Sequence, residues 1–425
     1  MENEFSKIRI QSNKFKRVQG LINYVNADNI KAEHKRQSKN KAVGEDGVSK
    51  EEYEIKLDEN INELITRMRT FSYKPKPVKR VHIPKGNGKY RPLGIPSYED
   101  KLVQGVMRNC LDGVYEERFL DSSYGFRRKR NCHQAVKEVN NLIMKKKINF
   151  VVDADIKGFF ENINHEWLIK FLENDIDDKK FIRYIKRFLY GGIIEELKYY
   201  ESDKGTPQGG LISPVMANVY LYSVLDLWFE KHIKKYYKGE AYIVRYADDC
   251  VCMFQYENEA KRFCRELKER LKKFGLEIEE DKTKIMPFGR FARENNSEVE
   301  MFDFLGFTFI NGKTRTGKYR VLVRTSKKKL NQKKQNAKEW MEANMHINLL
   351  DLIEKINLKI RGHYRYYGVN GNYEGLMKFY RYVKICLYKT LKRRSQRSYL
   401  NWKRYNLLLK KHPIIEPKLY VDIWC

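Results

Sequence analysis

The pattern of apolar and polar positions changes its period several times along the chain. In the central part, short runs rich in β-branched and aromatic residues predict strands at Phe150–Ile156, Tyr242–Tyr246 and Cys250–Phe254. Segments with helical spacing separate and follow these runs, and they predict helices at Glu166–Glu173, Lys179–Leu189, Ser213–Lys231 and Asn258–Phe274. Two further strand-like segments are Glu277–Phe288 and Asp303–Ile310. Strands and helices in this order predict an α+β fold with an antiparallel sheet.

The two flanks of this region differ from it and from each other. Upstream, prolines bound two β-branched runs, Val78–Ile83 and Tyr90–Ile95, which predict a two-stranded ribbon that turns at Gly86-Asn87-Gly88. A helix is expected next, at Lys101–Phe119. Downstream, helical spacing dominates and predicts long helices at Leu349–Ile360, Gly375–Leu391 and Tyr399–Lys411.

Length and charge narrow the class of protein. The 425 residues exceed what one hydrophobic core usually serves, so two or three units are expected. Lys and Arg outnumber Asp and Glu by 85 to 55, and the segment from Asn311 onward holds 28 of these cations against seven acids. A concentrated positive field of this kind favours a polyanion, so nucleic acid is the expected partner.

Several other classes are not expected. No apolar run approaches the roughly 18 residues that a membrane span needs, and the chain starts with a polar segment instead of a signal sequence, so a cytoplasmic protein is predicted. The seven cysteines include no C-x-x-C pair, which argues against a zinc site or a disulfide framework.

Two pairs of acidic residues lie within or between the predicted apolar strands. Asp248 and Asp249 lie between two apolar strands, where a tight turn would ordinarily favour Asn-Gly or Asp-Gly. Asp153 and Asp155 are two positions apart in another apolar strand and therefore lie on one face of the sheet. A solvated turn would explain the first pair alone. The two pairs together are typical of a site with two divalent cations that performs phosphoryl or nucleotidyl transfer.

The surrounding motifs resemble those of the reverse transcriptases encoded by bacterial group II introns. The relevant segments are Arg91 to Pro96, Ser123 to Arg127, Asp155 to Phe160, Gly205 to Pro214, Tyr246 to Asp249, Asp281 to Lys284, Phe304 to Phe307 and Arg361 to Gly368. They follow one another in the family's order, and the similarity runs from about Lys41 to Tyr420. The resemblance implies a right-hand polymerase fold, with fingers and palm followed by an α-helical thumb/maturase domain. The implied division is an N-terminal extension at 1–72, fingers and palm at 73–310 and a basic helical domain at 311–425.

The same resemblance implies roles for individual residues. Asp155, Asp248 and Asp249 would be the catalytic and metal-binding acids, holding two Mg²⁺ ions, whereas Asp153 matches no metal ligand of the family. Phe160 would exclude the 2′-hydroxyl of a ribonucleotide, although a plain core position would explain this aromatic residue too. Contacts to the deoxynucleoside triphosphate or to the template and primer are implied for Lys85, Arg91, Gln208 and Lys282. RNA contacts are expected at Arg361, Tyr364, Arg365, Lys392, Arg393 and Arg394.

The expected function is therefore RNA-directed DNA synthesis on an RNA template with a DNA primer, together with binding of group II intron RNA to assist splicing and mobility. Two alternatives remain open on the sequence: a free-standing reverse transcriptase used in host defence, and an RNA-binding maturase whose polymerase has decayed. The end of the chain at Cys425 leaves no room for a nuclease domain, so a compact bacterial form is expected.

Overall fold

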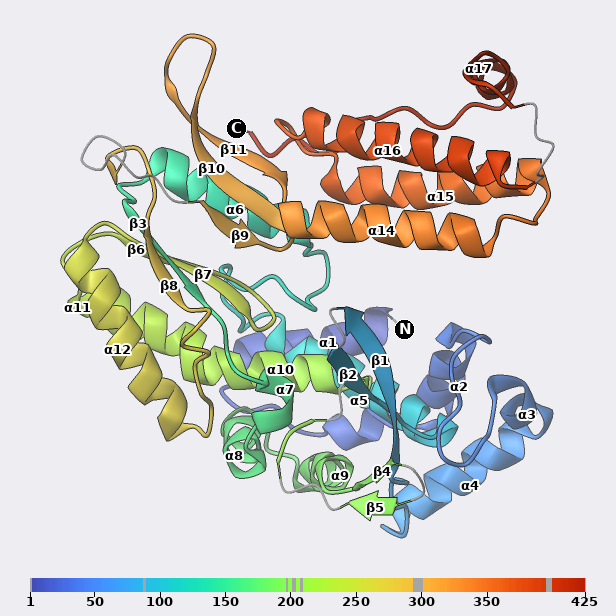
Figure 1. The fold of residues 1–425 in the computed structure, drawn as a ribbon. Helices are drawn as coiled ribbons and strands as arrows, with labels where there is room; N and C mark the ends of the chain where they lie inside the picture. The colour runs from blue at the N-terminus through green and yellow to red at the C-terminus, as the bar shows by residue number, and fades with distance from the viewer. Residues whose placement is uncertain are drawn as a thin grey trace.

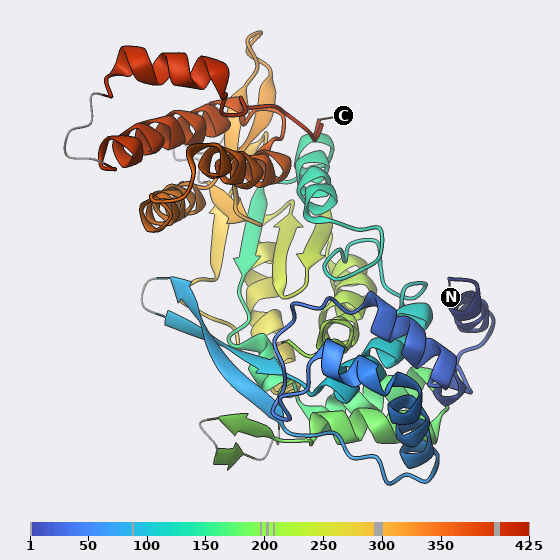
Figure 2. The ribbon, with the colours of Figure 1, turned by 90° about the vertical axis from the view of Figure 1, so that its right-hand side faces the viewer.

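The computed structural model describes residues 2–86, 89–195, 198–200, 204–206, 209–292, 301–394 and 400–424. It confirms a mixed α+β architecture. N-terminal helices lie at one end, a four-stranded sheet lies in the middle, and long C-terminal helices lie at the other end (Figure 1 and, after a quarter turn, Figure 2). No helix within these ranges is long and apolar enough to span a bilayer.

The N-terminal part consists of helices around a small sheet. The helices are α1 (Glu2–Lys14), the 3-10 helix η1 (Leu21–Tyr24), α2 (Ala27–Arg36), α3 (Lys50–Ile55), α4 (Leu57–Arg69) and α5 (Tyr98–Tyr115). The sheet has the order β2-β1-β4-β5, with β1 (Val78–Gly86), β2 (Lys89–Ile95), β4 (Ile193–Glu195) and β5 (Lys198–Tyr200). Strands β1 and β2 are antiparallel, which confirms the predicted ribbon.

The central sheet has the order β6-β7-β3-β8 and is antiparallel throughout. Its strands are β3 (Phe150–Ala154), β6 (Ala241–Tyr246), β7 (Asp249–Phe254) and β8 (Lys284–Pro287). The helices of this part are α6 (Cys132–Lys145), α7 (Phe159–Asn162), α8 (His165–Asp175), α9 (Lys179–Leu189), α10 (Ser213–Leu221), α11 (Lys234–Tyr236) and α12 (Glu257–Lys273). Two π-helical turns, η2 (Tyr222–Asp226) and η3 (Phe229–Ile233), connect α10 to α11.

The described C-terminal residues, 301–394 and 400–424, add a third sheet and further helices. The sheet has the order β11-β10-β9, with β9 (Phe302–Phe304), β10 (Phe307–Lys313) and β11 (Tyr319–Thr325). The helices are α14 (Lys327–Ala343), α15 (Leu349–Tyr367), α16 (Tyr373–Lys392) and α17 (Trp402–Lys411). Helices α14, α15 and α16 lie side by side, and the β10–β11 hairpin projects past them (Figure 1).

Two hydrophobic cores meet at the central sheet. Successive side chains of a strand point to opposite faces, and in β3 the buried Val152 belongs to one core while the buried Val151 belongs to the other. The first core joins the N-terminal helices to α8, α10 and α12, so residues 1–72 share a core with the segment that follows them. The second core joins α6, the central sheet and the β11-β10-β9 sheet to the C-terminal helices.

Several predicted elements have other bounds in the structure, among them the expected helix Ser213–Lys231, which ends as α10 at Leu221 and continues as π-helical turns. The segment Glu277–Phe288 forms strand β8 only at Lys284–Pro287. The segment Asp303–Ile310 is split into β9 and β10, because Leu305 and Gly306 adopt φ of 51° and 79° and turn the chain. Residues 310 and 311 both lie in β10, and the long C-terminal helices begin with α14 at Lys327.

Tyr364 is a correction to the predicted RNA-binding set. Its side chain is completely buried in the second core, and its hydroxyl donates a hydrogen bond to the carbonyl oxygen of Ile415 at 3.3 Å. In helix α15 it lies on the apolar face together with Ile356 and Ile360, which are also buried. Tyr364 therefore stabilises the C-terminal helices and does not offer its ring to RNA.

We predict that Tyr364→Ala lowers the free energy of unfolding by about 3–5 kcal/mol, the usual cost of truncating a large buried aromatic residue. Tyr364→Phe removes only the hydroxyl and should cost about 1 kcal/mol. Urea unfolding measures both values, and binding of RNA to the folded Phe variant serves as the control. A small loss of stability in the Ala variant, or a large loss of RNA affinity in the Phe variant, would contradict a core role.

Candidate active site

Three acids meet at one end of the central sheet. Asp248 lies in the turn between β6 and β7, where Ala247 has a φ of 57°, and Asp249 begins β7. Cys250 of β7 pairs with Ala154 of β3, so Asp155, the next residue after β3, lies at the same end of the sheet as Asp249. The structure therefore brings together the three acids that the sequence singled out.

The carboxyl groups of these acids influence one another. Partial desolvation, followed by the carboxylates of Asp248 and Asp155, raises the pKa of Asp249 to about 6 even though this residue stays in contact with solvent. Desolvation also raises the pKa of Asp248, and Asp155 adds to the shift. The guanidinium of Arg91 in β2 opposes both shifts, which places its charge near the two acids. The pKa values of Asp248 and Asp249 therefore stay raised although nearby cations oppose the shift.

Asp153 adds a fourth carboxyl to the same face of the sheet. Desolvation and the carboxylates of Asp249, Asp155 and Asp303 raise its pKa to about 7, while Lys284 opposes the shift. Near neutral pH this residue therefore carries a proton for part of the time.

Lys282 contacts the acidic cluster directly. Its Nζ lies 2.7 Å from Oδ2 of Asp155 and 3.7 Å from Oε2 of Glu279. The backbone sets this position, because the amide of Glu279 donates to the carbonyl oxygen of Asp155 at 2.8 Å and Ile278 forms a β-bridge with Ile156. The hydrogen bond to Asp155 raises the pKa of Lys282, which keeps the ammonium charged.

The donor set suits a hard divalent cation. Carboxylate oxygens are the ligands that Mg²⁺ and similar ions prefer. Desolvation, together with neighbouring carboxylates, raises the pKa values of Asp248 and Asp249, as expected at a place where added positive charge would be favourable. Within the described ranges, however, no group of three or more acidic, His or Cys side chains is arranged around a metal position. In this structure the ammonium of Lys282 supplies the positive charge beside Asp155.

A buried ion pair fixes the strand that leads into the acidic turn. The Arg245 guanidinium donates to both carboxylate oxygens of Asp226, at 2.7 and 2.5 Å, and both side chains are fully buried. The same guanidinium donates to Oδ1 of Asn218 at 3.0 Å and to the carbonyl oxygen of Ala247 at 2.9 Å. Because Ala247 directly precedes Asp248, these bonds position the backbone of the turn.

The segment Ser123 to Arg127 packs against the same turn. Tyr124 donates its amide to the carbonyl oxygen of Arg245 at 2.8 Å, and Asn218 donates to the carbonyl oxygen of Gly125 at 2.7 Å. A Cβ at Gly125 would lie only 2.2 Å from the amide nitrogen of Ala247. Glycine is therefore required there, since any side chain would push the acidic turn out of place.

The structure describes the side chains of some predicted nucleotide-contact residues and not of others. Phe160 lies in α7, is half-buried, and its ring centroid is 5.3 Å from that of Phe159. The amide of Thr206 donates to its carbonyl oxygen at 2.8 Å, and Gly205 packs closely against the same oxygen. Arg91 is exposed on β2. Gln208 and the side chain of Lys85 lie outside the described residues.

The remaining C-terminal cations also differ from one another. Arg361, Arg365 and Lys392 are exposed. Arg393 is exposed but forms an ion pair with Glu342 at 2.9 Å. Arg394 is half-buried and donates to the carbonyl oxygen of Ile347 at 3.0 Å, which indicates a structural role for this guanidinium.

The residues that support the acids are not among those predicted from the sequence. Arg245 and Asp226 each stand as a lone charge in an apolar segment, and two such charges of opposite sign are a signal for a buried pair. Lys329 of α14 was missed as well, although its charge opposes the rise in the pKa of Asp249. Nothing in the local sequence around Lys329 indicates that α14 reaches the acidic turn.

Comparison with known proteins identifies the class of this site. Residues 83–309 match the family described as Reverse transcriptase (RNA-dependent DNA polymerase). The chain is 39% identical over 186 residues to the Group II intron-encoded protein LtrA of Lactococcus lactis, a match that covers 44% of this chain and 31% of that protein. It is 32% identical over 202 residues to Protein YkfC of Escherichia coli, covering 47% of this chain and 52% of YkfC.

Eukaryotic proteins are similar too. A putative COX1/OXI3 intron 1 protein of Saccharomyces cerevisiae is 37% identical over 181 residues, which cover 42% of this chain and 21% of the yeast protein. The chain thus spans between a fifth and about half of the length of these curated relatives.

We predict that Arg245→Ala lowers the free energy of unfolding by about 3–5 kcal/mol, because it leaves the Asp226 carboxylate buried without a partner. The matched control is Lys261→Ala, which removes an exposed ion pair with Glu257 on α12 and should cost below about 1 kcal/mol. Urea unfolding of the two variants beside the wild type provides the comparison. Equal losses in both variants would show that the buried pair has no special role.

Proposed function

Because the chain belongs to the reverse transcriptase family, we propose that it synthesises DNA on an RNA template from a DNA primer and deoxynucleoside triphosphates. The observation that carries this proposal is the convergence of Asp155, Asp248 and Asp249 at one end of the central sheet, within the segment that matches the family. In this proposal the central sheet is the palm, the β1–β2 ribbon belongs to the fingers, and α14 to α16 form the thumb.

Asp155 and Asp248 would hold two Mg²⁺ ions, and Asp249 would complete the acidic cluster. Divalent cations bound there would lower the pKa of an attacking 3′-hydroxyl and stabilise a pyrophosphate leaving group. The protein's own cations have supporting roles. Arg91, whose charge reaches Asp248 and Asp249 from β2, would neutralise a triphosphate, and Lys282 would balance the charge of Asp155, whose Oδ2 lies 2.7 Å from its Nζ.

Binding of group II intron RNA is the second part of the proposal. It is supported by the names of the relatives and by the 28 Lys and Arg residues from Asn311 onward, of which Arg361, Arg365 and Lys392 are exposed. If the C-terminal region neutralises about eight phosphates, RNA affinity should fall by several powers of ten between low and physiological salt. A free-standing reverse transcriptase would share the polymerase activity but would not promote intron splicing.

We predict that Asp248→Ala reduces primer extension by at least about 10²-fold, since it removes a preorganised charge from the reacting centre. Binding of the primer–template should remain close to that of the wild type, because a carboxylate does not contact phosphates. Asp58→Ala, which removes an exposed carboxylate on α4, is the matched control and should retain activity. Loss of primer–template binding together with extension would indicate a structural role for Asp248. A wild-type protein that binds RNA without extending primers would indicate a maturase with a decayed polymerase.

A second prediction concerns the choice of sugar. Phe160→Val replaces a half-buried ring of α7 with a smaller side chain and should increase incorporation of ribonucleotides relative to deoxynucleotides, because it leaves room for a 2′-hydroxyl. The measurement is the ratio of the two kcat/KM values in the variant and in the wild type. Phe159→Leu, in the buried neighbour, is the control for a general loss of packing. An unchanged ratio together with a lower unfolding midpoint would identify Phe160 as a core residue.

A further inference from the structure

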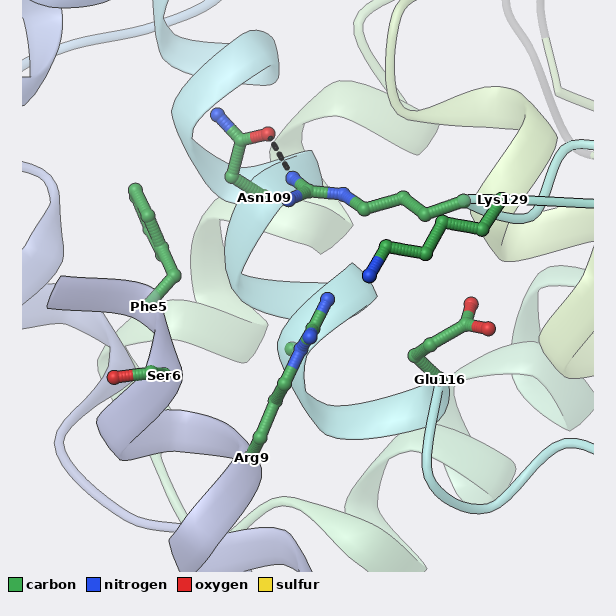
Figure 3. A pocket seen from close by; sticks show the side chains of 8 residues that line it. Phe5, Ser6, Arg9, Asn109, Glu116 and Lys129 are labelled. Atoms are coloured by element: carbon green, nitrogen blue, oxygen red, sulfur yellow. Dashed lines mark hydrogen bonds between the residues drawn. The ribbon is translucent and has the colours of Figure 1, made fainter. Parts of the chain in front are cut away.

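A separate cationic hollow lies at the N-terminal end of the molecule. Its volume is about 260 Å³, and its walls are α1, α5 and the chain that follows α5. Figure 3 shows the charged ends of Arg9 and Lys129 reaching into it from opposite walls, with Asn109 and Glu116 at its edge. Arg128 completes the lining, and its guanidinium donates to Oδ1 of Asn109 at 2.9 Å. None of these residues belongs to the acidic site.

The walls of the hollow are held firmly. Ser12 of α1 donates to the carbonyl oxygen of Val114 in α5 at 2.6 Å, and Gly113 allows Ile8 to pack against the α5 backbone. The chain after α5 is fixed by the buried Arg127, which donates to the carbonyl oxygens of Leu120 at 2.7 Å and Ser123 at 2.9 Å. The hollow is therefore a built feature of the fold.

Positive charge exceeds negative charge around the hollow. The two nearby acids are already engaged, Glu116 by Arg127 at 3.1 Å and Asp112 by Arg108 at 3.7 Å and Arg128 at 3.5 Å. Arg9 and Lys129 form no ion pair with any residue in the described ranges. The lining includes one carboxylate, that of Glu116, which is paired with Arg127, so the cations of this small concavity outnumber its acids and favour an anion as occupant.

A neighbouring hollow extends the same surface. Its volume is about 540 Å³, and it shares Arg128, Lys129 and Glu116 with the first. It adds the cations Arg130 and Lys137 and one acid, Glu138, so cations still outnumber acids in its lining. The first hollow is smaller than the roughly 300–1,000 Å³ of typical small-molecule pockets, so it suits a single phosphate group better than a whole nucleotide. A continuing row of cations suits an anion that repeats, as phosphates do along a nucleic-acid strand.

We propose that Arg9, Arg128 and Lys129 bind a backbone phosphate of an RNA strand, at a site separate from the acidic cluster. This inference rests on the proposed function in that it takes RNA as the partner. The segment between Ser123 and Lys129 packs on the acidic turn at Gly125 and lines the hollow at its other end, so a strand bound there contacts the same segment that supports Asp248.

The test compares the double variant Arg9→Ala/Lys129→Ala with Lys238→Ala/Lys272→Ala. The control removes the same charge from two exposed lysines that line neither hollow. Affinity for an unstructured RNA strand is measured in a salt titration without Mg²⁺ or nucleotides. The first variant should bind RNA several-fold more weakly, and its plot of log affinity against log salt should be shallower by about 0.7 for each lost phosphate contact. The control should lose less affinity and keep the wild-type slope.

Additional measurements distinguish RNA from a small phosphate ligand, and loss of binding from loss of folding. Arg9→Lys/Lys129→Arg should retain affinity, and unfolding midpoints show whether the Ala variant folds. If inorganic phosphate raises the unfolding midpoint of the wild type but not of the Ala variant, while RNA affinity is the same in both, a small phosphate ligand replaces RNA and the proposal is overturned. An unchanged slope with no effect of phosphate also overturns it. Because these measurements need no catalysis, absent primer extension would count against the proposed function alone.

Discussion

The buried pair between Arg245 and Asp226 is the interaction on which the acidic site depends. Two full charges without solvent contact are tolerated only because every oxygen of the carboxylate is engaged and the guanidinium uses its remaining donors on Asn218 and on the backbone at Ala247. Asp226 ends a π-helical turn, and such turns often occur at functional positions in helices. The pair thus connects the irregular helix to the turn that carries Asp248.

The positive charges around the acids come from distant parts of the chain. Arg91 arrives on β2, Lys282 on the segment before β8 and Lys329 on α14. Each lowers the cost of keeping several carboxylates together, and none of them is adjacent in sequence to the acids it balances. The pKa of Asp249 therefore depends on distant elements. Displacement of the β1–β2 ribbon or of α14 would change it, because Arg91 and Lys329 would move away from the acid.

Much of this arrangement could be predicted from the sequence. The strands around the acidic turn are apolar runs, and the ribbon before them has β-branched runs joined by a glycine-rich turn. These local patterns were sufficient to predict both elements. The split at Leu305 was missed because a non-glycine residue with positive φ leaves no sequence signal. Tyr364 was misassigned because an aromatic residue among arginines resembles a stacking residue, whereas its helical face is decided by packing that only the fold reveals.

The central sheet also determines how a loss of stability would spread through the molecule. Strand β3 contributes Val152 to one core and Val151 to the other, and β7 does the same with Cys252 and Val251, so the central sheet separates the two cores while packing against both. A destabilised β3 would therefore loosen the packing of both cores at once.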